Sequence, residues 1–92
     1  MKEYVSVDVE TTGLAPKQDK IIEIGAVRVR DGQIVGSFTC FVNPGRILPA
    51  HITELTGILQ EQVDGAEPME SVLPAFLEFA GDLPLMGHRI LF

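Results

Sequence analysis

The 92-residue sequence is poor in cysteine, in long apolar runs and in basic side chains. Its single cysteine, Cys40, excludes an internal disulfide framework and favours a reducing compartment, so we predict a cytoplasmic protein. No apolar run approaches the roughly 18 residues of a membrane span, and residues 1–10 lack the apolar stretch of a signal peptide. Thirteen acidic side chains against seven basic ones argue against a surface that holds phosphates by clustered bases. Any nucleic-acid ligand would need its charge neutralised locally, for example by bound metal ions.

The remaining composition is that of a chain with a packed core. Hydrophobic residues make up 46% of the sequence and charged residues 22%. There is no low-complexity run, internal repeat or linker-like segment, so the sequence predicts at most one small domain. A chain of this size buries only about 60–65% of its extended-chain surface and has little stability to spare.

The first half of the chain has the pattern of three strands. Residues 2–10 alternate between apolar and polar, and residues 20–30 are dense in isoleucine and valine. Residues 33–43 follow an Asp-Gly pair, which is typical of a two-residue hairpin turn. The segment IIEIGAV is apolar at neighbouring positions, which predicts cover on both faces of the sheet.

The second half changes to helical spacing. Residues 49–57 are expected to form a short helical turn, and residues 68–80 a longer amphipathic helix. Pro74 inside the longer helix predicts either a kink or a later helix start. Residues 83–88 are expected to return as a fourth strand. A hairpin-built half plus one strand–helix–strand crossover predicts a mixed α/β sheet.

Two carboxylates occupy the first strand, within the stretch VSVDVETTGL. Asp8 and Glu10 are two residues apart, so they share one strand face at about 6.5–7 Å while the valines share the other. Both can bind one divalent ion, and Mg²⁺ and Mn²⁺ prefer such oxygen ligands. A solvated strand face is the alternative for this pair alone. The turn Thr11–Gly13 follows at the strand end, where α/β sheets usually bind ligands, and this favours a site.

Several segments, taken in order, resemble the motifs of the DnaQ-like (DEDD) 3′→5′ exonucleases, a family that includes the proofreading epsilon subunit of bacterial DNA polymerase III. Residues 8–14, DVETTGL, resemble the first exonuclease motif. Residues 21–27 and 41–44 resemble the second strand and the end of the third. Residues 52–58, ITELTGI, resemble a loop segment of the family, and residues 87–92 the beginning of the second motif. Matches in the right order are more specific than any one motif.

The resemblance implies an RNase H-like sheet and a metal-dependent 3′→5′ exonuclease that hydrolyses the 3′-terminal phosphodiester of DNA, as in proofreading. It implies that Asp8 and Glu10 are catalytic and bind two divalent ions, Mg²⁺ or Mn²⁺, in the complete domain. The implied partners are the 3′ end of single-stranded DNA or RNA and a DNA polymerase subunit, with no membrane. The residues that it implies for binding the terminal nucleotide are Thr11, Leu14, Leu55, Thr56 and Phe92.

Structural alternatives stay open for several of these residues. Leu14 and Leu55 can equally be core residues, and Thr56 a polar residue that ends a helix. Glu23, an acid inside an apolar strand, is costly unless paired. It either supports the metal site from a second layer or serves a structural hydrogen bond.

The family pattern continues beyond the last residue of this sequence. The resemblance implies a third metal-binding aspartate directly afterwards, and later a tyrosine or histidine base with a fourth aspartate. We therefore predict that residues 1–92 are the N-terminal half of a single exonuclease domain, inactive alone and prone to self-association. The self-association is expected because the sheet would lack covering helices on one side, which would expose the facing isoleucines or Val5, Val7 and Val9. The alternatives are a catalytically inactive exonuclease-like module that binds a partner protein, and an unrelated small α/β binding domain.

Overall fold

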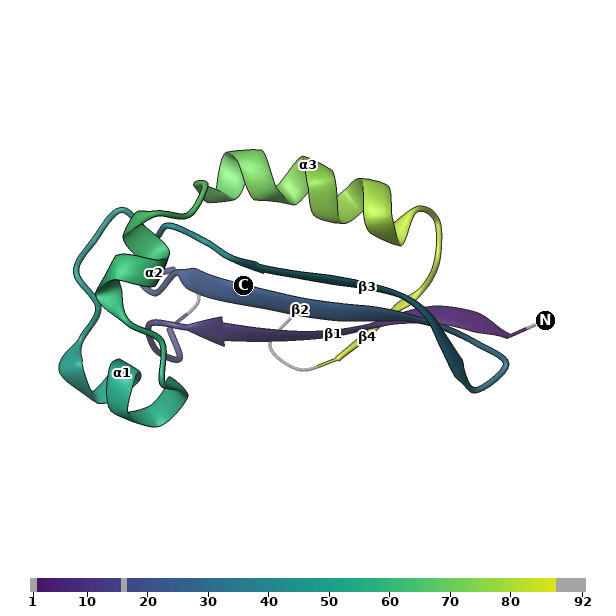
Figure 1. Ribbon diagram of the computed structural model, residues 1–92, viewed down its shortest axis with the longest axis horizontal. Helices are drawn as coiled ribbons and strands as arrows, with labels where there is room; N and C mark the ends of the chain where they lie inside the picture. The colour runs from purple at the N-terminus through teal and green to yellow at the C-terminus, as the bar shows by residue number, and fades with distance from the viewer. Residues whose placement is uncertain (1, 16, 88–92) are drawn as a thin grey trace.

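The computed structural model describes residues 2–15 and 17–87 as three strands, three helices and a final strand (Figure 1). The predicted hairpin, short helix, long helix and fourth strand are present. Helix α2 is not predicted from the sequence, because five residues with one buried side chain are too few to show a helical period. The elements are β1 (Glu3–Thr11), β2 (Ile21–Arg30), β3 (Gln33–Phe41), α1 (Ala50–Thr56), α2 (Gln60–Asp64), α3 (Met69–Ala80) and β4 (Leu85–Gly87).

The strands form one mixed sheet in the order β3-β2-β1-β4. Strand β2 pairs antiparallel with both β1 and β3, and β4 pairs parallel with β1 after the crossover through α3. Asp31 and Gly32 form the hairpin turn with φ values of 49° and 83°, the left-handed pair that such a turn requires. The mixed α/β sheet predicted from the sequence is confirmed.

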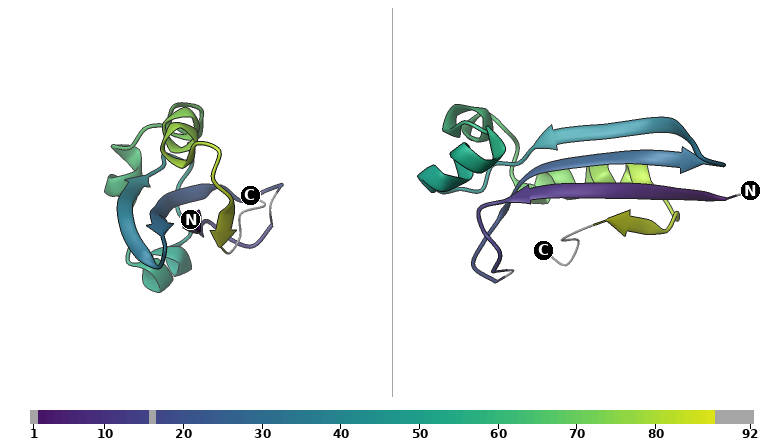
Figure 2. Two further views of the ribbon diagram at one scale, coloured as in Figure 1. Left: turned by 90° about the vertical axis from the view of Figure 1, so that its right-hand side faces the viewer. Right: turned by 90° about the horizontal axis from the view of Figure 1, so that it is seen from below.

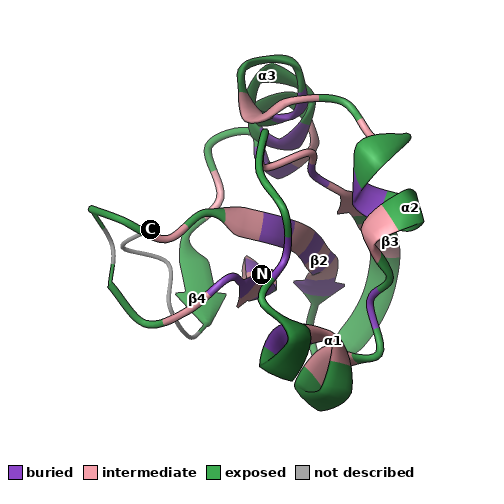
Figure 3. Cartoon of the chain, turned by 90° about the vertical axis from the view of Figure 1, so that its left-hand side faces the viewer, coloured by how far each residue is buried: buried purple, intermediate pink, exposed green. Residues whose placement is uncertain are grey.

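Helix α3 covers one face of this sheet (Figures 1 and 3). Its buried residues recur every four positions and form one core with β1 and β2, made of Val72, Phe76, Ala80, Val5, Val7, Val9, Ile24 and Ala26 together with Val42. The expected exposure of the β1 valines is therefore wrong, since they are only 0–6% exposed. The physical reason is that the crossover from β3 to β4 has to pass over this face, and it does so as an amphipathic helix.

Helix α3 begins at Met69, directly after Pro68, so the later start suggested by Pro74 does not occur. Pro74 lies inside the helix at an exposed position. Gly81 ends the helix with φ 59°, a conformation in which a side chain would be strained. Within residues 2–15 and 17–87, no helix is both long enough and apolar enough to cross a membrane.

A second, smaller core lies at the end of the sheet where β1 stops. Ile22 is fully buried there among side chains of α1, α2 and their connections, namely Leu48, Ile52, Ile58 and Val63. Ile24 belongs instead to the core under α3. The apolar strand IIEIGAV is thus covered on both sides, as the sequence predicts, although by different helices at different points.

Candidate active site

Asp8 and Glu10 lie on the sheet face opposite α3. In the register of β1 with β2, Asp8 stands beside Gly25 and Glu10 beside Glu23. Asp8 is exposed and Glu10 is half-buried. The right-hand view of Figure 2 looks onto this face, and helices α1 and α2 reach only its end in the described part of the chain. Among the described residues, Asp8 is therefore open to a ligand from solvent and Glu10 is partly so.

A β-bulge next to these carboxylates decides which residue of β2 faces them. Thr11 pairs with Ile21 and Glu10 with Glu23, so Ile22 is the extra residue of the pair. A bulge inserts one unpaired residue and re-aims its neighbours, which is common beside active sites. Here Ile22 enters the small core, and Glu23 stands directly across from Glu10 on the same face.

The electrostatics agree with this placement. Partial burial, followed by the nearby charges of Glu10 and Asp8, raises the pKa of Glu23 above its usual value of 4.5. Negative charge is therefore in excess here, and a cation would relieve it. No group of three histidine, cysteine or acidic side chains is gathered for a metal ion in the ranges 2–15 and 17–87. Asp8 and Glu10 still suit Mg²⁺, which often takes only one or two carboxylates and keeps several waters.

The residues predicted to bind a nucleotide differ in exposure: the leucines are exposed, whereas Thr11 is buried. Leu14 and Leu55 are 77% and 76% exposed, which excludes the alternative that they are core residues. Leu14 follows β1 in the loop, and Leu55 lies in α1 at the same end of the sheet (Figure 1). Thr11 is buried, and its hydroxyl donates to the carbonyl oxygen of Gly13. That leaves the two leucines as apolar side chains presented to solvent at the end of the sheet where β1 stops.

Thr56 has the structural role that the sequence left open. Its hydroxyl donates to the carbonyl of Ile52 at 2.8 Å and accepts the N–H of Ile58 at 3.1 Å. Gly57 follows with φ 78° and ends α1. Thr56 therefore fastens the end of the helix that carries Leu55, while Phe92 lies outside the described residues.

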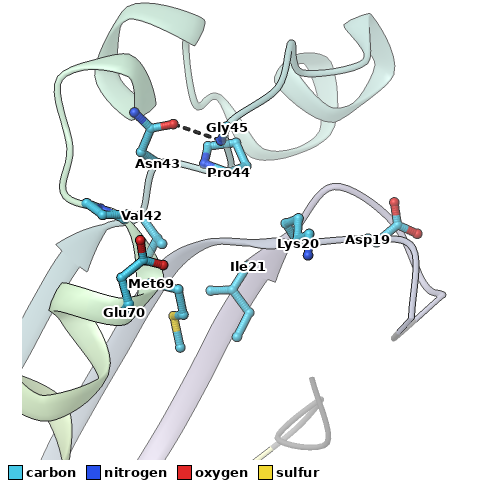
Figure 4. A pocket seen from close by; sticks show the side chains of 10 residues that line it. Asp19, Lys20, Ile21, Val42, Asn43, Pro44, Gly45, Met69 and Glu70 are labelled. Atoms are coloured by element: carbon cyan, nitrogen blue, oxygen red, sulfur yellow. Dashed lines mark hydrogen bonds between the residues drawn. The ribbon is translucent and has the colours of Figure 1, made fainter.

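A pocket of about 550 Å³ opens near the same end of the sheet (Figure 4). It lies between the start of β2, the segment after β3 and the first turn of α3. Ile21, Val42 and Met69 supply its apolar surface, with Lys20 and Glu70 among its polar residues. Asp8 and Glu10 are not part of its lining, so the pocket and the carboxylates are separate features.

The comparisons with known proteins decide the family. A family model described as "Exonuclease" (RNase_T) matches residues 5–92. The chain belongs to this exonuclease family. It is 52% identical over 90 residues to the PolC-type DNA polymerase III of Clostridium perfringens and 51% identical to that of Latilactobacillus sakei. Each match covers 98% of this chain and 6% of the relative, so the chain spans a small part of the length of these polymerases.

Solved exonuclease structures share the fold. The nuclease domain of 3'hExo, a DEDDh family member bound to rAMP, is 30% identical with a TM-score of 0.72, over 84% of this chain and 42% of that one. Exonuclease I of E. coli in complex with a dT13 oligonucleotide is 16% identical with a TM-score of 0.80, over 97% and 21%. At that identity the second match supports the fold alone. The resemblance to DnaQ-like exonucleases and the RNase H-like sheet are confirmed.

The position of Glu23 yields a stability prediction for this exonuclease-family chain. Because its pKa is raised, folding favours the protonated carboxyl. The stability linked to that proton is present below pH 4.5 and is lost as pH rises through the raised pKa. Cross-strand like charges cost about 0.2–1 kcal/mol, so Glu23→Gln is expected to raise the melting temperature by about 1–8 °C at pH 7 without metal.

Thermal unfolding followed by circular dichroism checks this prediction. Near pH 3.5 the Glu23→Gln gain is expected to vanish, because the Glu23 carboxyl is then protonated and as uncharged as the glutamine that replaces it. Glu78→Gln, an exposed acid on α3, is the matched control and is expected to change the melting temperature by less than about 1 °C. An equal gain at both pH values would show that repulsion from Glu10 and Asp8 is not the cause.

Proposed function

We propose that this chain carries the first part of a metal-dependent 3′→5′ exonuclease site that hydrolyses the 3′-terminal phosphodiester of single-stranded DNA in proofreading. The observation that carries the proposal is the pair Asp8 and Glu10 on the open face of β1, in a chain of the exonuclease family. DNA is proposed as the substrate because the PolC-type relatives are DNA polymerases. We propose the cytoplasm as its location and a DNA polymerase as its protein partner for the same reason.

Each described site residue has a defined task in this proposal. Asp8 and Glu10 hold the divalent ions, Mg²⁺ or Mn²⁺. When bound, such ions activate a water and stabilise the leaving oxygen of a displacement at phosphorus. The exposed side chains of Leu14 and Leu55 pack against the terminal base. Thr11 and Thr56 fix the ends of the segments that carry these leucines, since both hydroxyls bond to nearby main chain. Phe92 completes the proposed nucleotide-binding set.

We further propose that residues 1–92 are the N-terminal half of a single exonuclease domain. The matched solved domain of 3'hExo is more than twice as long as this chain's match to it, since only 42% of that chain is covered. The chain therefore contributes two carboxylates and the nucleotide-binding leucines, while the general base and further acids belong to later segments. This division predicts binding of metal and nucleotide without hydrolysis.

The first test is hydrolysis by the purified 92-residue chain. With Mn²⁺ and 5′-labelled single-stranded DNA, we expect no shortening above the metal-only control. In the proposed half-domain, two carboxylates do not hold two ions in catalytic geometry and the general base belongs to a later segment. The positive control is a longer protein, extended through the reading frame beyond Phe92. We expect an aspartate directly after Phe92, and we expect the extended protein to trim the 3′ end. Trimming by the 92-residue chain that is lost in Glu10→Ala would contradict the half-domain, and a frame without these acids would favour the inactive binding module.

The same preparation tests self-association. With the valine face covered by α3, the edges of the described sheet remain as a basis. Strand β4 is one of these edges, and its Leu85 and Met86 are 41% and 56% exposed. Unpaired edge strands recruit further copies, and an added charge blocks such pairing. Light scattering is expected to show more than a monomer for the chain and a monomer for Met86→Lys. A monomeric wild-type chain at the same concentration would end this part of the proposal.

A further inference from the structure

The loop between β1 and β2 is closed on itself at its base. The N–H of Thr12 donates to the carbonyl of Lys20 at 2.9 Å, and the N–H of Lys20 donates to the hydroxyl of Thr12 at 3.0 Å. From outside, the guanidinium of Arg46 donates to the carbonyl of Gln18 at 2.7 Å. The loop is thereby fastened to both its own strand ends and the segment before α1.

The carboxylate of Asp19 lies at the centre of this loop. One oxygen accepts the hydroxyl of Thr12 at 2.8 Å, and the other accepts the N–H of Ala15 at 3.0 Å. The N–H of Asp19 donates back to the carbonyl of Ala15 at 2.7 Å, so these two residues are linked twice. The bonds from Ala15 and Thr12 lower the pKa of Asp19 below its usual value of 3.8, which indicates that they favour the ionised form.

The Asp19 carboxylate also packs closely against Gly13. A β-carbon on Gly13 would overlap with the Asp19 carboxylate, so only glycine leaves room for it. The carboxylate thus holds the residues on both sides of Leu14, through contact with Gly13 and a hydrogen bond to Ala15. Leu14 itself is 77% exposed and contributes nothing to either core. A large apolar side chain is therefore kept in solvent on a turn whose main chain is held from behind.

We propose that Asp19 is a positioning residue of the exonuclease site, which holds the Gly13–Ala15 turn so that Leu14 meets the 3′-terminal nucleoside in one orientation. This inference rests on the function proposed above and adds a residue that touches neither metal nor nucleotide. A pre-ordered turn spares the nucleotide the entropic cost of ordering the loop on binding. Loss of the Asp19 bonds is expected to weaken nucleotide binding while the sheet stays folded.

Nuclear magnetic resonance on the ¹⁵N-labelled chain, titrated with thymidine 5′-monophosphate and Mg²⁺, tests the proposal. Asp19→Asn replaces one of the two acceptor oxygens with an NH2 donor, so the Ala15 N–H and the Thr12 hydroxyl cannot both be accepted, and we expect about tenfold weaker binding. Heteronuclear relaxation is expected to show faster motion at residues 13–15 and unchanged values in β1 and β2. Asp31→Asn is the matched control, because the Asp31 carboxylate also accepts a main-chain N–H, from Lys2 at 3.0 Å, but at the far hairpin.

Two hydroxyl variants guard against a failure of Asp19→Asn to fold. Thr12→Val removes one of the two bonds to the Asp19 carboxylate, together with the acceptor for the Lys20 N–H, and is expected to weaken binding about threefold. Thr12→Ser keeps the hydroxyl and is expected to restore binding. Wild-type affinity in both Asp19→Asn and Thr12→Val, or weaker binding with an unchanged turn, would overturn the positioning role. Failure of the wild-type chain to bind the nucleotide at all would instead sink the proposed function, and this inference with it.

Discussion

Asp8→Ala is expected to weaken Mn²⁺ binding by this chain by more than about tenfold, since losing even an outer-shell partner of a metal costs 10–100-fold. The wild-type chain is expected to bind weakly, because the proposed site has two carboxylates, Asp8 and Glu10, and water would complete the shell of the ion. Isothermal titration calorimetry at low ionic strength measures both proteins. Asp8 is exposed, so its removal leaves no hole in either core.

The control for this experiment lies on the same strand. Glu3 is also an acid of β1, but it stands at the opposite end and pairs with Arg30 at 3.4 Å. Such a surface pair contributes about 0–1 kcal/mol, so Glu3→Ala is expected to fold and to bind Mn²⁺ like the wild-type chain. Identical heats for the wild-type chain and Asp8→Ala would remove the metal site from this proposal. Equal losses of Mn²⁺ affinity in Glu3→Ala and Asp8→Ala would show that the binding is a general effect of net charge.

Phe76→Ala is expected to cost about 3–5 kcal/mol of unfolding free energy, the range for removing a buried aromatic ring. Phe76 is 7% exposed and is the largest of the buried α3 side chains in the core under that helix. Its ring also packs edge-on against Phe38 of β3 at 5.8 Å between centroids. Domains of this size are stable by about 5–14 kcal/mol in total, so this single change is expected to remove a large fraction of the stability.

Urea unfolding measures this loss against a neighbouring control. Leu77 is the next residue of α3 and is 55% exposed, so Leu77→Ala keeps the helix propensity and removes little buried surface. Its expected cost is below about 1 kcal/mol. Similar costs for the two variants would show that α3 is not packed on the sheet as described, and that the β1 valines are uncovered after all.

The pattern of residues within short segments determined much of the secondary structure of this protein without any tertiary information. The alternation of β1 assigned Asp8 and Glu10 to one face and the valines to the other, because side chains of a strand alternate. The Asp-Gly pair determined the hairpin, since a two-residue turn needs two left-handed residues. The spacing of apolar residues determined α3. These features depend on neighbours within a few positions, which a sequence displays directly.

Other features were decided only when distant segments met. The cover over Val5, Val7 and Val9 depends on the path of the crossover, which no pattern within β1 reports. Glu23 reaches Glu10 because a bulge places Ile22 in the small core with α1 and α2. The hydrogen bond of Asp19 to Ala15 and its close approach to Gly13 likewise form only when the loop folds back on itself. Alternation along a strand is local and periodic, whereas a bulge, a crossover and a closed loop are set by packing between residues far apart in the chain.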